Sequence, residues 1–135
     1  MAALNHTIVN VRSKEESAEF VSRIIGLQVL PQWARFLPVQ TSNGVTLDFA
    51  DAKDFRTQHY AFILTDGEFD LAFERLKESG APYYAHFDKS GAGKINHLWG
   101  GRGVYFNEPS GHFLEMITRP YGDYQDVVDD MKKGP

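Results

Sequence analysis

Four polar side chains lie in otherwise apolar segments, at matching places in the two halves of the 135-residue chain. His6 and Asp48 belong to the first half, and His59 and Glu115 to the second. Taken singly, each histidine could be a core residue bonded to a backbone carbonyl or could face solvent, and each carboxylate could be an exposed strand residue. Imidazole and carboxylate groups together hold divalent metal ions such as Fe, Mn, Ni, Co or Zn and leave coordination positions open. If the four groups meet, a cation would also relieve the repulsion between two buried carboxylates.

In the first half, the elements that must position these groups are expected in the order strand, helix and two further strands. Residues 4–11 alternate and are rich in β-forming side chains, which predicts a strand. Helical spacing of apolar residues predicts a helix over 16–25, with Ser13 three residues before Glu16 in the pattern of a capping box. Two further strands are expected at 35–41 and 45–50, because the Asn-Gly pair between them is typical of a hairpin.

The second half repeats this order. A strand is expected over 58–65, followed by a helix that Asp66 or Asp70 would cap and Gly80 would end. A short strand near 82–85 and an irregular, glycine-rich stretch over 91–103 come next. The last two strands, 103–107 and 112–118, flank Glu108-Pro109-Ser110-Gly111, which suits a type I turn.

These elements predict an α+β fold of two βαβββ modules in one chain, with the sheets curled around a cavity. The modules are expected at about 3–51 and 57–119, and the charged tail, 120–135, as a marginal helix. Side chains alternate along a strand, so Asp48 and Glu115 can face the cavity while their apolar neighbours pack beneath the helices. The two pairs of histidine and carboxylate would then converge on one point.

Composition restricts the class of protein. The net charge of −4 argues against nonspecific binding to nucleic acid or to an anionic membrane, and no apolar run approaches the length of a membrane span. The chain has no cysteine, so any metal must be held by histidines and carboxylates. The first residues lack the pattern of a secretory signal, so a cytoplasmic protein that binds a small molecule is expected.

A second group of candidates lies after the glycine-rich stretch. His97 could donate or accept a proton from a loop over the cavity, and Arg102 could bind an anionic group of the substrate. Trp99 and Tyr105 could contact the substrate. The alternative is an ordinary long hairpin that Trp99 anchors on the core, with Tyr105 used for packing.

Three segments, LNHTIVNV at 4–11, QHYAF at 58–62 and GRGVYFNEPSGHFLEMIT at 101–118, resemble the vicinal oxygen chelate superfamily. That superfamily includes glyoxalase I, extradiol dioxygenases, fosfomycin-resistance transferases and bleomycin-resistance proteins. The resemblance implies metal ligands at His6, His59 and Glu115. Glyoxalase I also uses a glutamate of the first module, where this chain has the shorter Asp48. This departure weakens the match to glyoxalase I.

The resemblance implies a metal-dependent enzyme of the glyoxalase or dioxygenase type, which chelates a small oxygen-bearing substrate through two oxygens. In a glyoxalase-like reaction Glu115 would act as the base, and in a dioxygenase-like reaction His97 could shuttle the proton. The alternative is a non-catalytic binding or resistance protein, with Trp33, Phe36, Trp99 and Tyr105 lining its cavity. A homodimer is expected, with the modules paired within one chain or between two.

Overall fold

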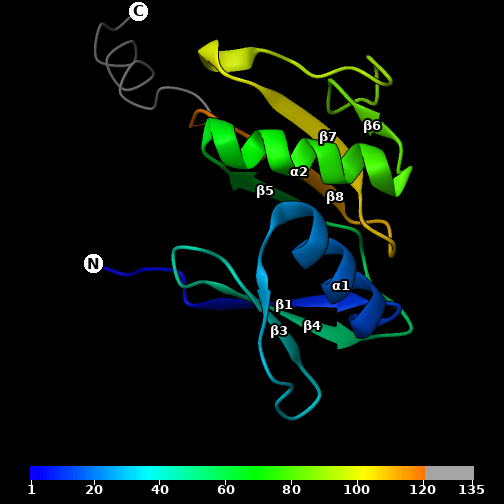
Figure 1. Cartoon of the computed structure of the whole chain (residues 1–135). Coiled ribbons are helices and arrows are strands. Elements are labelled where there is room, and N and C mark those ends of the chain that lie inside the picture. The colour runs from blue at the N-terminus through cyan, green and yellow to red at the C-terminus, as the bar shows by residue number, and fades with distance from the viewer. Residues whose placement is uncertain (121–135) are drawn as a thin grey trace, which may run out of the picture.

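The structure, a computed structural model, describes residues 1–120, and the expected tail helix lies outside the described residues from 121 on. Two modules follow one another along the chain, each with one helix against one four-stranded sheet (Figure 1). The two sheets remain separate and do not close into a barrel. This arrangement confirms the predicted α+β fold of two βαβββ modules.

In the first module the opening and closing strands are neighbours and run parallel, so the sheet order is β1-β4-β3-β2. The two-residue strand β2, at the edge of this sheet, was not predicted from the sequence. The predicted hairpin is present, with β3 antiparallel to β4. The elements are β1 (His6–Val11), α1 (Lys14–Ile25), β2 (Gln28–Val29), β3 (Leu37–Gln40) and β4 (Thr46–Asp51).

The second module has the same topology. Its sheet order is β5-β8-β7-β6, and β5 runs parallel to β8. The turn before β8 closes with the Gly111 N–H donating to the Glu108 carbonyl at 2.9 Å, as expected for a type I turn. The elements are β5 (His59–Ile63), α2 (Asp66–Ser79), β6 (Tyr83–Tyr84), the short 3-10 helix η1 (Leu98–Gly100), β7 (Gly103–Asn107) and β8 (Phe113–Ile117).

The start of α2 differs from the prediction, because Thr65 is the N-cap and neither Asp66 nor Asp70 is. The Thr65 hydroxyl accepts from the Glu68 N–H, and the Glu68 carboxylate accepts from the Thr65 N–H, which completes a capping box. The latter hydrogen bond lowers the pKa of Glu68 below its ordinary value. Neither of the two α-helices in the described part is long and apolar enough to cross a bilayer.

We predict that Thr65→Ala lowers the free energy of unfolding by about 1 kcal/mol, because the Glu68 N–H loses its cap. Thr57→Ala makes the same change at an exposed position outside any helix. Urea unfolding of the two variants measures the difference. Equal stability of both variants would contradict the assignment of the cap.

Each sheet buries one face against its helix, and we call the other face the open face. On β1, Val9 and Val11 are buried, whereas His6 and Ile8 on the alternate side are exposed. The buried residues of both modules form one continuous core. The polar residues at alternate positions are thereby left on the open faces.

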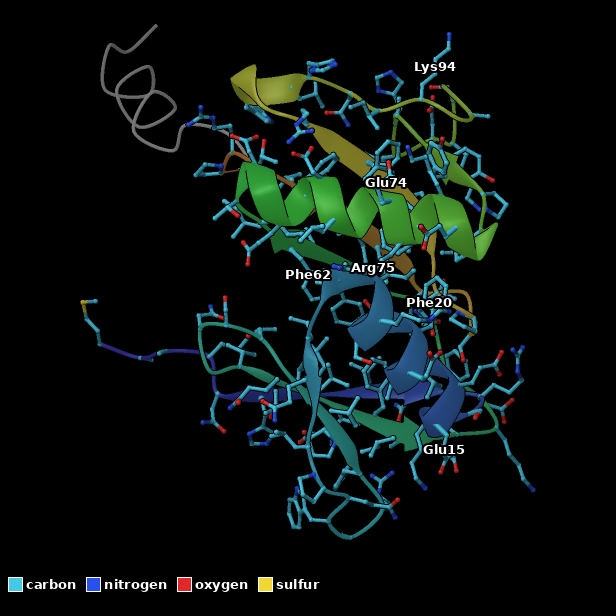
Figure 2. All side chains as sticks on the ribbon, in the orientation of Figure 1. Glu15, Phe20, Phe62, Glu74, Arg75 and Lys94 are labelled. Carbon is cyan, nitrogen blue, oxygen red and sulfur yellow. The ribbon has the colours of Figure 1, made fainter. Side chains whose placement is uncertain are left out.

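The two helices meet where the modules join. The Phe20 ring of α1 lies 6.2 Å from that of Phe106 in β7, and the Arg75 Nε of α2 donates to the Ile24 carbonyl at 3.1 Å. Figure 2 shows Phe20 and Arg75 in this region between the helices. Apolar packing and one hydrogen bond from a charged group therefore hold the modules together on the helix side.

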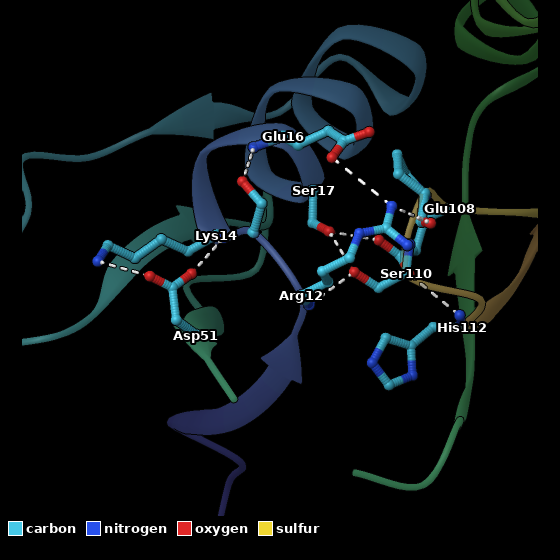
Figure 3. Close-up of polar contacts among 10 residues, drawn as sticks. Arg12, Lys14, Glu16, Ser17, Asp51, Glu108, Ser110 and His112 are labelled. Atoms are coloured by element: carbon cyan, nitrogen blue, oxygen red, sulfur yellow. Dashed lines mark hydrogen bonds and ion pairs between the residues drawn. The ribbon is translucent and has the colours of Figure 1, made fainter. Parts of the chain in front are cut away.

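A buried carboxylate forms a second connection between the modules (Figure 3). Glu108, 3% exposed, accepts a 2.6 Å hydrogen bond from the Ser17 hydroxyl of α1. Its other oxygen accepts from the backbone N–H groups of Ser110 and His112. The Arg12 N–H and guanidinium reach the same turn, at the Ser110 hydroxyl and the Pro109 carbonyl. The turn before β8 is thereby fixed to the first module.

His112 completes this junction. The ring is 2% exposed, and its Nδ1 accepts from the Gln58 N–H at 2.9 Å. That acceptor role leaves Nε2 as the donor to the Asn10 carbonyl at 2.7 Å. One neutral tautomer therefore links the end of β1 to the residue before β5.

We predict that Ser17→Ala lowers the free energy of unfolding by about 1 to 3 kcal/mol, because the buried Glu108 carboxylate loses a donor. Ser22→Ala on the same helix removes only a hydroxyl that bonds the Glu19 carbonyl, and we expect it to be nearly neutral. Thermal unfolding compares the two variants. If Ser17→Ala is no more destabilising than Ser22→Ala, Glu108 does not depend on this contact.

Candidate metal and substrate site

The parallel pairing of β5 with β8 brings the second histidine and carboxylate together. His59 lies opposite Phe113, and Ala61 lies opposite Glu115. Residues two apart on a strand share a face, so His59 and Glu115 are diagonal neighbours on the open face. The His59 Nε2 is 3.1 Å from the Glu115 Oε1.

The other ring nitrogen fixes the orientation of His59. Its Nδ1 is 2.9 Å from the Phe113 carbonyl oxygen, which can only accept. When Nδ1–H donates there, the Nε2 lone pair points at the carboxylate of Glu115, whose side chain is 4% exposed. A proton or a cation between Nε2 and the carboxylate satisfies both groups. Metal-binding histidines commonly donate their second N–H to a backbone carbonyl in this way.

The first module carries the equivalent pair at the same offset. His6 lies opposite Thr46, and Ile8 lies opposite Asp48, so the carboxylate again stands two residues beyond the partner of the histidine. His6 is exposed and its Nδ1 is 2.7 Å from the Asn5 side-chain oxygen. Asp48 is only 5% exposed, and its carboxylate makes no hydrogen bond or ion pair within residues 1–120.

The two pairs remain apart within one chain. Among the described residues no three His, Asp or Glu side chains lie close enough to hold a metal ion. The structure thus brings His59 and Glu115 together, and it does not bring His6 or Asp48 to them.

Aromatic side chains surround the second pair. The Tyr105 ring stacks at 5.9 Å from His59, and the exposed Phe87 ring stands edge-on to it at 5.2 Å. Ala61, Phe87 and Tyr105 line a cavity of about 480 Å³ with His59 and Glu115. Tyr105, which lies opposite Glu115 in the pairing of β7 with β8, was predicted from the sequence as a substrate contact, whereas Phe87 was not. Phe87 follows β6 in an irregular segment, where no periodicity predicts which way a side chain points.

The remaining candidates lie at other places in the fold. His97 and Trp99 are exposed around η1, and Trp99 adopts a left-handed conformation with φ 59°. Arg102 donates to Asp70 at 2.6 Å and to Asp66, both on α2. The hydrogen bond to Asp70 raises the pKa of Arg102 above its ordinary value.

Trp33 and Phe36, the other aromatic candidates, pack against each other at 5.8 Å, and Trp33 is 62% exposed. Neither lines the cavity of about 480 Å³ beside Glu115.

Comparison with known proteins shows the family of the chain. A sequence model of the Glyoxalase/Bleomycin resistance protein/Dioxygenase superfamily matches residues 3–116. The chain belongs to this superfamily. Similar structures include Oxidase ChaP-H2, with 48% identity, a TM-score of 0.87 and coverage of 90% of this chain and 96% of that one. Oxidase ChaP-H1 has 44% identity, the same TM-score and coverage of 90% and 99%.

A more distant relative within the superfamily is glutathione transferase FosA of Serratia marcescens. It is 24% identical over 123 residues, which cover 86% of this chain and 80% of the relative. The superfamily generally uses divalent metals and small-molecule substrates, and its members often form oligomers.

Proposed function

We propose that this protein is a metal-dependent enzyme of the glyoxalase or dioxygenase type, which binds a small oxygen-bearing organic substrate through two of its oxygens. The observation that carries the proposal is the pairing of His59 with the buried Glu115, whose Nε2 and Oε1 lie 3.1 Å apart while the Nδ1 of His59 lies 2.9 Å from the Phe113 carbonyl oxygen. The arrangement calls for a positive charge between the two side chains. A divalent cation supplies that charge and, when bound, polarises the substrate oxygens.

The donor set fits such an ion. His59 and Glu115 would provide one nitrogen and one oxygen ligand, and His6 a second nitrogen. Two imidazoles and one carboxylate suit Fe, Mn, Ni, Co or Zn and leave positions open for substrate. Asp48, buried on the first module without a hydrogen-bond partner in the described part, offers a further carboxylate on the same face as His6.

A second copy of the chain would bring His6 to His59 and Glu115. Within one chain the two pairs are separate, although each occupies the open face of its own sheet at the same offset. β1 and β5 each form an edge of their sheet in the described chain, so a second copy could dock along them. We therefore propose a homodimer in which each site combines the first module of one copy with the second module of the other.

The chain's own residues would then divide the remaining tasks. Glu115 would accept a proton where the substrate loses one, and Tyr105 would pack against the substrate body. His97 and Trp99 line none of the three cavities that contain His59, so both are left out of the proposed contacts. Arg102 is left out of the proposed contacts, because Asp66 and Asp70 occupy its guanidinium on the helix side of the sheet.

The relatives favour an oxidative reaction over a glyoxalase one. The two similar structures at 48% and 44% identity are both oxidases by name. Replacement of the first-module glutamate of glyoxalase I by the shorter Asp48 points the same way. We therefore propose a dioxygenase-like or oxidase-like reaction in preference to a glyoxalase-like one.

The aromatic cavity supports a second candidate, a binding protein without chemistry. Phe87 and Tyr105 could hold an apolar ligand in the cavity of about 480 Å³ without any metal. Ligand binding measured with and without a chelator separates the two candidates, because only chelation-dependent binding requires the metal.

We predict that His59→Ala abolishes stoichiometric uptake of a divalent metal and leaves the fold intact, since the ring is one third exposed and lies outside the core. His86→Ala, an exposed histidine in the loop after β6, should keep full uptake. Elemental analysis of the purified proteins measures the metal, and circular dichroism checks the fold. Unchanged metal content in the His59→Ala protein would refute the ligand assignment.

We predict that His6→Ala and His59→Ala each lose metal, and that refolding the two variants together restores about a quarter of the wild-type content. Half of a random mixture is mixed dimers, and each contains one site with both histidines. If both histidines of a site belonged to one chain, no mixture could restore it. No recovery in dimers shown to be mixed would therefore overturn the shared site.

A further inference from the structure

His59 stands where three cavities of the described chain meet. One is the aromatic cavity beside Glu115, and another, of about 530 Å³, is lined mainly by apolar residues of both modules. The third, of about 420 Å³, is lined by residues of β1, of β5 and of the segment before β5, and it has the most polar lining of the three. A ligand held at His59 can therefore contact both apolar and polar side chains.

The polar cavity contains a guanidinium that has no partner among residues 1–120. Asn10, Arg56, Gln58 and His59 are among the residues that line it. Arg56 makes no hydrogen bond, ion pair or ring contact in residues 1–120. Its five N–H donors are available to a planar anion that carries two oxygens.

The other arginines of the described chain differ from Arg56 in having a partner or in lying away from His59. Arg23 pairs with Glu19, and Arg102 with Asp66 and Asp70. Arg119 also makes no hydrogen bond, ion pair or ring contact in the described part, but it does not line the cavities that meet at His59. Arg56 is thus an uncommitted cation placed within reach of a ligand at His59, although the chain as a whole is acidic.

We propose that Arg56 binds an anionic oxygen group of the substrate, so that the substrate is an organic acid with a ring or apolar body. The inference rests on the proposed function, because the same molecule would place two other oxygens at the metal held by His59 and Glu115. The apolar body would lie against Phe87 and Tyr105, and the acidic group would enter the polar cavity. Arg56 is then a specificity-determining residue that lies on the linker between the modules.

Two small probes test the proposal. 3,4-Dihydroxybenzoate carries two adjacent oxygens and a carboxylate on the far side of the ring, whereas 4-methylcatechol has the same two oxygens and a neutral methyl group. Calorimetry with Ni(II)-loaded protein measures the dissociation constant of each. Because Arg56 is exposed, we expect a preference of about fivefold to tenfold for the acid, reduced by added salt.

Arg56→Gln should remove this preference and leave the affinity for 4-methylcatechol unchanged. Lys53→Gln is the matched control, because Lys53 carries the same charge on the same linker but does not line the polar cavity. This variant should keep the preference. An acid preference that survives in Arg56→Gln, or that Lys53→Gln abolishes equally, would overturn the role of Arg56.

Other outcomes separate this inference from the proposed function. If the wild type binds 4-methylcatechol but shows no preference for the acid, the Arg56 site is wrong and chelation stands. If only the acid binds, and binds through Arg56 whether or not metal is present, the anion site stands and the proposed function is wrong. If neither probe binds, both are wrong. A change in oligomeric state in Arg56→Gln, seen by light scattering, would assign the residue to an interface instead.

Discussion

The parallel ladder between the first and last strands of each module is the constraint from which the site follows. In both modules the histidine of the opening strand lies opposite the residue two positions before the carboxylate of the closing strand. Two-residue steps keep side chains on one face of a sheet, so the ladder places each imidazole diagonally beside an acid on the open face. A shift of one residue would turn either group into the apolar core.

The junction between the modules determines which of the histidines and carboxylates can meet within one chain. Buried hydrogen bonds at Glu108 and His112, together with the contacts between α1 and α2, fix the second module against the first from the helix side. Within the described part of one chain, His6 and Asp48 therefore do not join His59 and Glu115 in a group able to hold a metal ion. In the homodimer that we propose, a second copy of the chain would supply the missing first module.

Local patterns predicted the repeated order of elements well, because capping, hairpin and turn signals act over a few residues. The exceptions were also local in origin. β2 is two residues long and too short to show alternation, and Thr65 caps α2 in place of the more obvious Asp66 or Asp70. Phe87 and Arg56 could not have been predicted as neighbours of His59, because both lie in irregular segments whose directions depend on packing elsewhere.

The sequence by itself determined the duplicated fold and the types of side chain able to hold a metal, since periodicity and residue chemistry are properties of short segments. Only the tertiary structure decided which of these groups meet. Strand register brought His59 beside Glu115, and packing of α2 paired Arg102 with Asp70 of that helix. Asp48 was left buried without a partner in the described chain. These outcomes depend on how distant strands pair and how two modules pack, and no segment of the chain contains that information alone.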